Sequence, residues 1–191
     1  MRADARANRD GIVEAALELF RAQGNFDVSL RSIAARANVG VATLHRHFPD
    51  RESLITTAVE QLHEATLAIV EERIARWDDN PEAAWKGAIH RLVATGIAPL
   101  ASSGSEFAVA EGRVDAFLRQ MRERDLRPVE RLLKKAAAQG FAPGDLDPHR
   151  FVAGLVALSR PLPELTMKLL PDQCEWMIDV HIAGLRALAD R

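Results

Sequence analysis

Apolar residues recur every three to four positions along almost the whole chain, which is the spacing of helices with one buried face. In the first such segment Ile12, Ala16 and Phe20 share a stripe, and Gly24 follows as a stop signal. No segment shows the sustained alternation of apolar and polar residues that a half-buried strand needs. The sequence therefore predicts an all-α fold.

Capping residues and helix breakers divide this pattern into about nine helices. Their expected ranges are residues 6–23, 30–37, 41–47, 51–76, 82–101, 105–125, 127–140, 148–160 and 172–189. Ser29, Asp50 and Asp147 are good N-caps, and the region from Pro161 to Pro171 separates the last two helices. The long helix over 51–76 is typical of a connector between two bodies. We therefore place one domain at residues 1–53 and a second at residues 54–191.

Few features of the sequence favour catalysis or a membrane location. Cys174 and His181 lie seven residues apart, which is about 10.5 Å along a helix and too far for direct proton transfer. We find no glycine-rich phosphate loop and no cluster with metal-ligand spacing, so we expect no enzyme, no cofactor and no metal. The longest weakly polar stretch, residues 151–158, is too short to span a bilayer, and the N-terminus lacks a signal peptide's apolar segment. We expect a cytoplasmic protein without membrane contact.

Residues 29–48 form two short predicted helices joined by a three-residue turn, an arrangement typical of a helix-turn-helix. The local charge of this segment supports the interpretation. Between residues 28 and 51 the bases Arg31, Arg36, Arg46 and Arg51 face one acid, Asp50, which gives a local charge of +3 in a chain of net charge -2. A positive patch confined to this motif is what binding to DNA phosphates requires.

The run SLRSIAARANVGVATLHRHFPDRESL, residues 29–54, resembles the DNA-binding domain of TetR/AcrR-family transcriptional regulators. The upstream AALELF, residues 15–20, and Gly24 resemble that family's first helix, so the likeness covers about residues 9–58. Four positions depart from the family pattern: Asn38 replaces a usual Gly, Gly40 a frequent Ser or Thr, Ala42 a Gly or small residue, and His45 a Tyr. Because Asn tolerates left-handed backbone, we expect the turn to survive.

The resemblance implies a role for each matching position. Arg31 matches the residue that reaches a base edge, Val41 and Ala42 would meet a thymine methyl, and Arg46 would reach a base or a phosphate. The implied phosphate contacts are Ser29, Thr43, His45 and Arg51. The alternative is that these polar residues merely decorate a small helical bundle.

For the C-terminal domain the resemblance implies a homodimer through its last two helices, about residues 148–160 and 172–189, and a pocket for a small-molecule effector. The last helix has a broad apolar stripe, which could equally pack inside one subunit: Cys174, Met177, Ile178, His181, Ile182, Leu185 and Leu188. Our candidates for the pocket lining, which could instead be ordinary core, are His63, Trp85, Ile89, Phe107, Phe117, Met121, Met167 and Trp176.

The resulting hypothesis is a regulator, with repression the commoner behaviour in the family, that binds a pseudo-palindromic operator in double-stranded DNA as a dimer. A small effector would release it. Two alternatives stay open: a DNA binder of the same fold without an effector, and a helical small-molecule-binding or enzymatic protein that does not use its helix-turn-helix.

Overall fold

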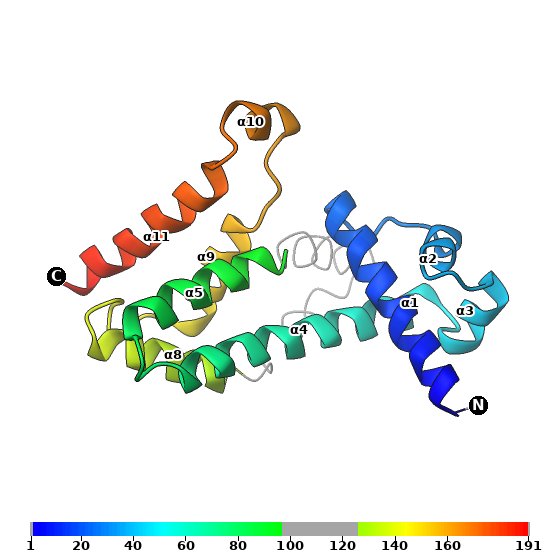
Figure 1. The fold of residues 1–191 in the computed structure, drawn as a ribbon, viewed down its shortest axis with the longest axis horizontal. Coiled ribbons are helices and arrows are strands. Elements are labelled where there is room, and N and C mark those ends of the chain that lie inside the picture. Colours follow the sequence, from blue (N-terminus) through cyan, green and yellow to red (C-terminus); the bar gives the residue numbers. More distant parts are fainter. Residues whose placement is uncertain (1, 97–125, 191) are drawn as a thin grey trace, which may run out of the picture.

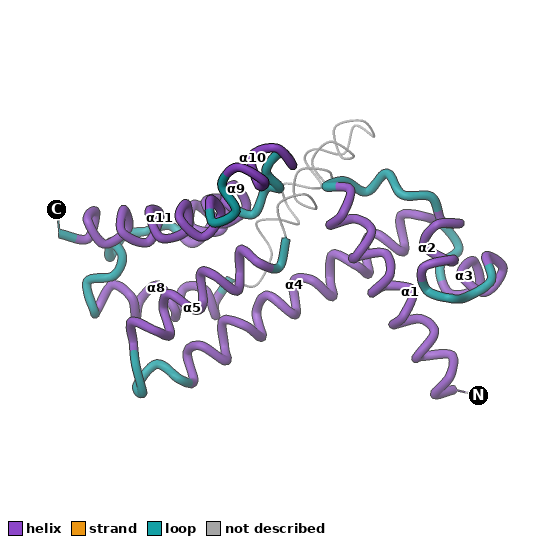
Figure 2. Tube along the Cα trace, turned by 45° about the horizontal axis from the view of Figure 1, so that its top comes forward, coloured by secondary structure: helices purple, strands orange, loops and turns teal. Residues whose placement is uncertain are grey.

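The computed structural model describes residues 2–96 and 126–190, with side chains from residue 7 onward. These two ranges contain helices and connecting loops and no strand, as the sequence predicts (Figure 2). The helices are α1 (Arg2–Gln23), α2 (Leu30–Arg36), α3 (Val41–His47), α4 (Arg51–Ala75), α5 (Pro81–Ala94), α8 (Arg127–Ala138), α9 (Pro148–Leu158), α10 (Glu164–Leu169) and α11 (Gln173–Ala189).

The helices form two groups along the molecule (Figure 1). Helices α1, α2 and α3 lie together at one end and make up the head, while α5, α8, α9 and α11 pack at the other end as the body. Helix α4 runs from the head into the body, so it is the connector predicted over residues 51–76.

Each group has its own apolar core, and α4 contributes to both. The head core contains the fully buried side chains of Phe20, Leu44 and Phe48. Leu54, Ala58 and Leu62 from the first half of α4 belong to this same core. Val70, two turns further along α4, belongs to the body core instead. The connector is therefore a structural part of both groups.

The body core is built around two aromatic side chains. Trp85 of α5 is 1% exposed, and its indole stacks on the Phe151 ring of α9 with 5.7 Å between ring centroids. Helix α11 packs on the body through Ile178, Ile182 and Leu185, which are buried. Part of the apolar stripe predicted on the last helix is thus used inside one subunit.

Head and body also meet away from the connector. The Arg21 Nε atom at the end of α1 donates a hydrogen bond of 2.9 Å to the main-chain carbonyl of Thr95, the residue that caps α5. Gly96 has a φ of +65°, and a Cβ atom there would lie 3.4 Å from the Arg21 side chain. The last turn of α1 is therefore fixed to the end of α5.

Three expectations about element bounds need correction or fall outside the structure. The region from Pro161 to Pro171 is not only a linker, because α10 forms within it at Glu164–Leu169. The helix predicted over 82–101 ends at Ala94, where Gly96 takes up left-handed backbone. The helix predicted over 105–125 lies outside the described residues.

Within the described ranges, every helix is too short or too polar to cross a membrane.

Candidate DNA-contacting surface

The helix-turn-helix is fixed by local hydrogen bonds and one unusual backbone conformation. The Ser29 hydroxyl caps α2 by accepting a hydrogen bond of 3.0 Å from the Ser32 amide, as predicted for an N-cap. Asn38 in the turn has a φ of +54°, the left-handed conformation that Asn adopts more readily than most residues. The turn therefore keeps its geometry without the glycine that is usual at this position.

Helix α3 presents one buried and one open face. Leu44 is fully buried in the head core and anchors the helix. Val41 is 40% exposed, and Ala42, His45 and Arg46 are exposed around it. The resemblance implies a DNA contact for each of these four residues, and together they form a mixed apolar and cationic face of the kind that reads a major groove.

Helix α3 also carries a contact between two of its own predicted DNA-binding side chains. The Arg46 Nη2 atom donates a hydrogen bond of 2.9 Å to the Thr43 hydroxyl. Thr43 is half-buried and Arg46 is exposed, so this hydrogen bond holds the guanidinium beside α3 on its solvent-facing side. The pair places a charge beside the exposed apolar residues of α3.

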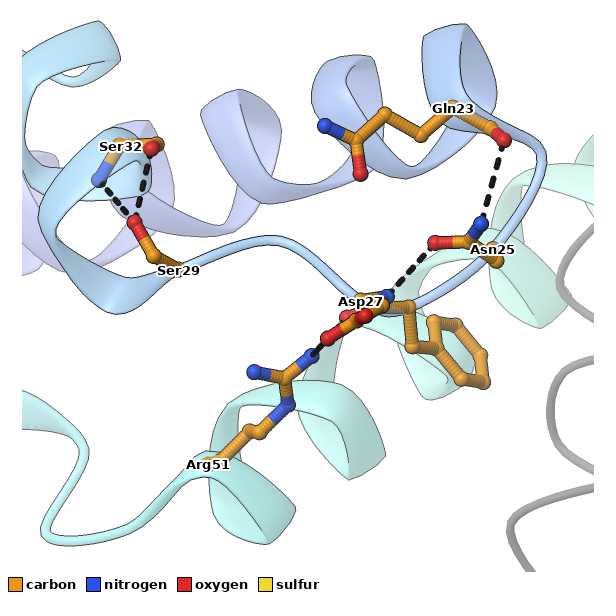
Figure 3. Close-up of polar contacts among 7 residues, drawn as sticks. Gln23, Asn25, Asp27, Ser29, Ser32 and Arg51 are labelled. Carbon is orange, nitrogen blue, oxygen red and sulfur yellow. Dashed lines mark hydrogen bonds and ion pairs between the residues drawn. The ribbon is translucent and has the colours of Figure 1, made fainter.

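Two of the four arginines that make up the predicted positive patch form ion pairs with acidic residues of the head. Arg36 forms an ion pair of 2.6 Å with Glu18 of α1. Arg51 lies 3.6 Å from a carboxylate oxygen of Asp27 and donates a hydrogen bond to the carbonyl of Phe26 (Figure 3). Because nearby acids partly neutralise Arg36 and Arg51, this surface carries less net positive charge than the sequence suggests. Arg31 and Arg46 are exposed.

Arg9 is a further cation at this end of the molecule that the motif analysis missed. Its guanidinium lies 5.0 Å from the centroid of the Phe48 ring and donates a hydrogen bond of 3.2 Å to the Thr57 hydroxyl. No local pattern singles it out, because it lies more than thirty residues before either partner in the chain.

The structure does not gather the described pocket candidates in one place. Trp85 and Ile89 are buried in the body core, while His63 is half-buried on α4. The Met167 sulfur contacts the Cys174 sulfur at 3.9 Å, and Trp176 is 58% exposed on α11.

The remaining pocket candidates, Phe107, Phe117 and Met121, lie outside the described residues. A surface groove of about 410 Å³ between α5 and α11 has Lys86, Asp179 and Arg186 in its lining and none of the candidates. These eight positions stay predictions.

Together, the two short helices, the left-handed turn and the open face of α3 define a helix-turn-helix protein with a separate helical body. A family model of the tetR family of bacterial regulatory proteins matches residues 12–58. The solved structure of a TetR transcriptional regulator from Streptomyces coelicolor has 26% sequence identity to this chain and a TM-score of 0.65. That likeness covers 93% of this chain and 98% of the other. Residues 12–58 thus match the tetR family's model, and the chain as a whole is similar in fold to solved TetR regulators.

Other relatives agree with this assignment. A TetR regulatory protein from Mycobacterium vanbaalenii is 26% identical, with a TM-score of 0.61 over 97% of this chain and 98% of its own. The HTH-type transcriptional regulator TcmR of Streptomyces glaucescens is 36% identical over 88 residues, 46% of this chain and 38% of that protein. A regulator of Staphylococcus aureus strain USA300 is 38% identical over 61 residues, 32% of this chain and 33% of its own length. The matches to these curated relatives thus span only about a third of their length.

Proposed function

We propose that this protein is a ligand-responsive transcriptional regulator, acting as a repressor, that binds a pseudo-palindromic operator as a homodimer. The observation that carries the proposal is the open face of α3, where Val41, Ala42, His45 and Arg46 project from a helix fixed by the buried Leu44. A short helix with exposed apolar and cationic side chains fits a major groove, where it meets thymine methyls, base edges and phosphates.

Dimerisation is supported by an apolar stripe on the open side of α11. Trp176, Val180 and Leu188 are 58%, 49% and 48% exposed. Gly184 completes their spacing of four residues, and its missing side chain leaves open space. Because Ile178, Ile182 and Leu185 already pack inside the subunit, the proposed dimer uses the opposite side of α11 together with the neighbouring α9.

Release by a small effector rests on the two-part architecture. The body is joined to the head by α4 and by the hydrogen bond from Arg21 to Thr95. An effector that favours one position of α5 or α4 would therefore favour one position of the heads, whose operator half-sites are spaced by about 34 to 36 Å or a multiple. Such coupling is typically about 1 to 3 kcal/mol. In this role the protein works in the cytoplasm and catalyses no reaction.

Selection of bound fragments from a random DNA pool tests the proposal, at one stated salt concentration because phosphate contacts make the affinity depend on salt. We expect enrichment of an inverted repeat with two half-sites. Enrichment of a single half-site would contradict binding as a dimer. No enrichment, with protein whose unfolding is cooperative, would contradict DNA binding itself.

A further inference from the structure

Arg51 is turned toward the protein's own backbone. It is the first residue of α4, and the loop between α1 and α2 passes over it (Figure 3). Its Nη2 atom donates to the carbonyl oxygen of Phe26 and lies 3.6 Å from Asp27 Oδ1. The side chain is 39% exposed, less than the 57% of Arg36 in its ion pair. A guanidinium that contacts a main-chain carbonyl and a carboxylate of the same loop restrains that loop, here the one between α1 and α2.

The loop that Arg51 holds leads directly into the helix-turn-helix. Phe26 is buried, and its ring meets the edge of the Phe20 ring with 5.1 Å between centroids. The Phe26 carbonyl also accepts a hydrogen bond of 2.8 Å from the Val28 amide. Since Ser29 caps α2 one residue later, a shift of this loop would shift the start of α2 and, through it, α3.

The Arg51 side chain thereby joins the first turn of α4 to the loop that precedes α2. Asn25 Oδ1 accepts a hydrogen bond of 2.8 Å from the Asp27 amide, which shapes the loop from within, while Arg51 holds it from outside. Hydrogen bonds from a charged donor are the stronger ones, so removing the Arg51 guanidinium takes the stronger of two hydrogen bonds from the Phe26 carbonyl and leaves the one from the Val28 amide. Arg51 thus links the start of the connector to the start of α2.

We propose that Arg51 is a positioning residue for DNA binding, which orients the helix-turn-helix on α4, and that it is not one of the phosphate contacts. This inference rests on the proposed function, and it revises the phosphate role that the sequence resemblance implies for Arg51. We call this role a clamp, because the Arg51 side chain holds the loop before α2 against the start of α4. A clamp and a phosphate contact differ in how operator affinity responds to salt.

The first test compares operator affinity at several salt concentrations for the wild type, Arg51→Met and Arg46→Met. Each phosphate contact contributes about 0.9 to the slope of log K against log salt, so a variant that removes one such contact from each head of the dimer reduces the slope by about 1.8. We expect Arg51→Met to weaken binding roughly tenfold at every salt concentration with an unchanged slope. Arg46→Met is the control, because its exposed guanidinium should flatten the slope. A slope for Arg51→Met that falls by about 1.8 would overturn the proposal.

The second test needs no DNA and separates this proposal from the proposed function. Hydrogen exchange of the amides of residues 26–32 should be faster in Arg51→Met than in the wild type, and unchanged in Arg46→Met. Equal exchange in wild type and Arg51→Met would overturn the clamp even if the wild type binds an operator. If Arg51→Met does not fold, Arg51→Gln carries both measurements, since it removes the charge and shortens the donor. A wild type that selects no DNA contradicts the proposed function, and the exchange rates still decide the clamp.

Discussion

At the scale of single residues, Asn38 bears the strain of the turn between α2 and α3. Its φ of +54° lies in the left-handed region, which costs most non-glycine residues roughly 1 to 2 kcal/mol. We expect Asn38→Ala to lower the free energy of unfolding by about 1 kcal/mol, and Asn38→Gly to change it by less than about 0.5 kcal/mol. Urea denaturation of the three proteins measures both effects. Equal destabilisation in the two variants would show that the Asn38 side chain matters more than its backbone.

His181 gives the body a dependence on pH. Its ring lies against α9, where a Cβ atom on Gly154 would be 3.3 Å from His181 Cε1. Its Nε2 atom is buried and has no hydrogen-bond partner among the residues that the structure describes, and burial lowers the pKa of this imidazole. Because the folded pKa lies below the unfolded value of about 6.5, the unfolded chain takes up the proton first as pH falls.

The contribution of His181 to stability is therefore fully present above about pH 6.5 and is lost as the pH falls through the folded pKa. We expect the unfolding free energy, measured at a fixed protein concentration, to drop less between about pH 7.5 and about pH 5 in His181→Leu than in the wild type. An identical pH dependence in the wild type and His181→Leu would assign the effect to other groups.

At the scale of elements, α3 begins without a side-chain cap. Gly40 is its N-cap, with ordinary backbone angles of φ -71° and ψ 147° and open space where a Cβ would be. We expect Gly40→Ser to stabilise the head by a few tenths of a kcal/mol, because the hydroxyl accepts a hydrogen bond from the first turn. Gly40→Ala is the control, since it adds a Cβ without an acceptor. Thermal unfolding measures both, and a stabilised Ala variant would point to backbone entropy instead of capping.

The elements that the sequence predicts best are those with strong local signals. Ser29, Asp50 and Asp147, the predicted N-caps, accept hydrogen bonds of 2.7 to 3.0 Å from the first turns of their helices, which local chemistry alone specifies. Helix α10 escaped prediction because it is short, lies between prolines and exposes Leu165 and Leu169 at 68% and 70%. Without a buried face such a helix leaves no periodic pattern to recognise.

The residues of the candidate site also differ in whether a local signal in the sequence predicts their role. The open face of α3 follows from helix period, since Leu44 must be buried. The roles of Arg36 and Arg51 depend on Glu18 and Asp27, which lie 18 and 24 positions earlier in the chain. Local charge counting treats all such arginines as equal, so only the folded structure separates a clamp from an exposed cation.

At the scale of the whole molecule, the proposed dimer makes the body a requirement for DNA binding. Val180 lies in the open stripe of α11, and Val180→Glu would bury a charge in the proposed interface. We expect this variant to sediment as a monomer and to bind a full operator at least roughly tenfold more weakly, since both half-sites no longer act together. Ala138→Glu adds the same charge on an exposed part of α8 and should leave both properties unchanged. A Val180→Glu protein that remains a dimer would move the interface elsewhere.

Helix α4 has a consequence for anyone who wishes to exchange parts between regulators. The side chains of Leu54, Ala58 and Leu62 complete the head core, and Val70 starts the body core. A transplanted head cut at residue 53 would leave its own interior open, whereas a junction between residues 63 and 69 cuts neither interior. Chimeric proteins made from this chain should therefore keep α4 as far as Leu62 with the head, so that each apolar core is exchanged intact.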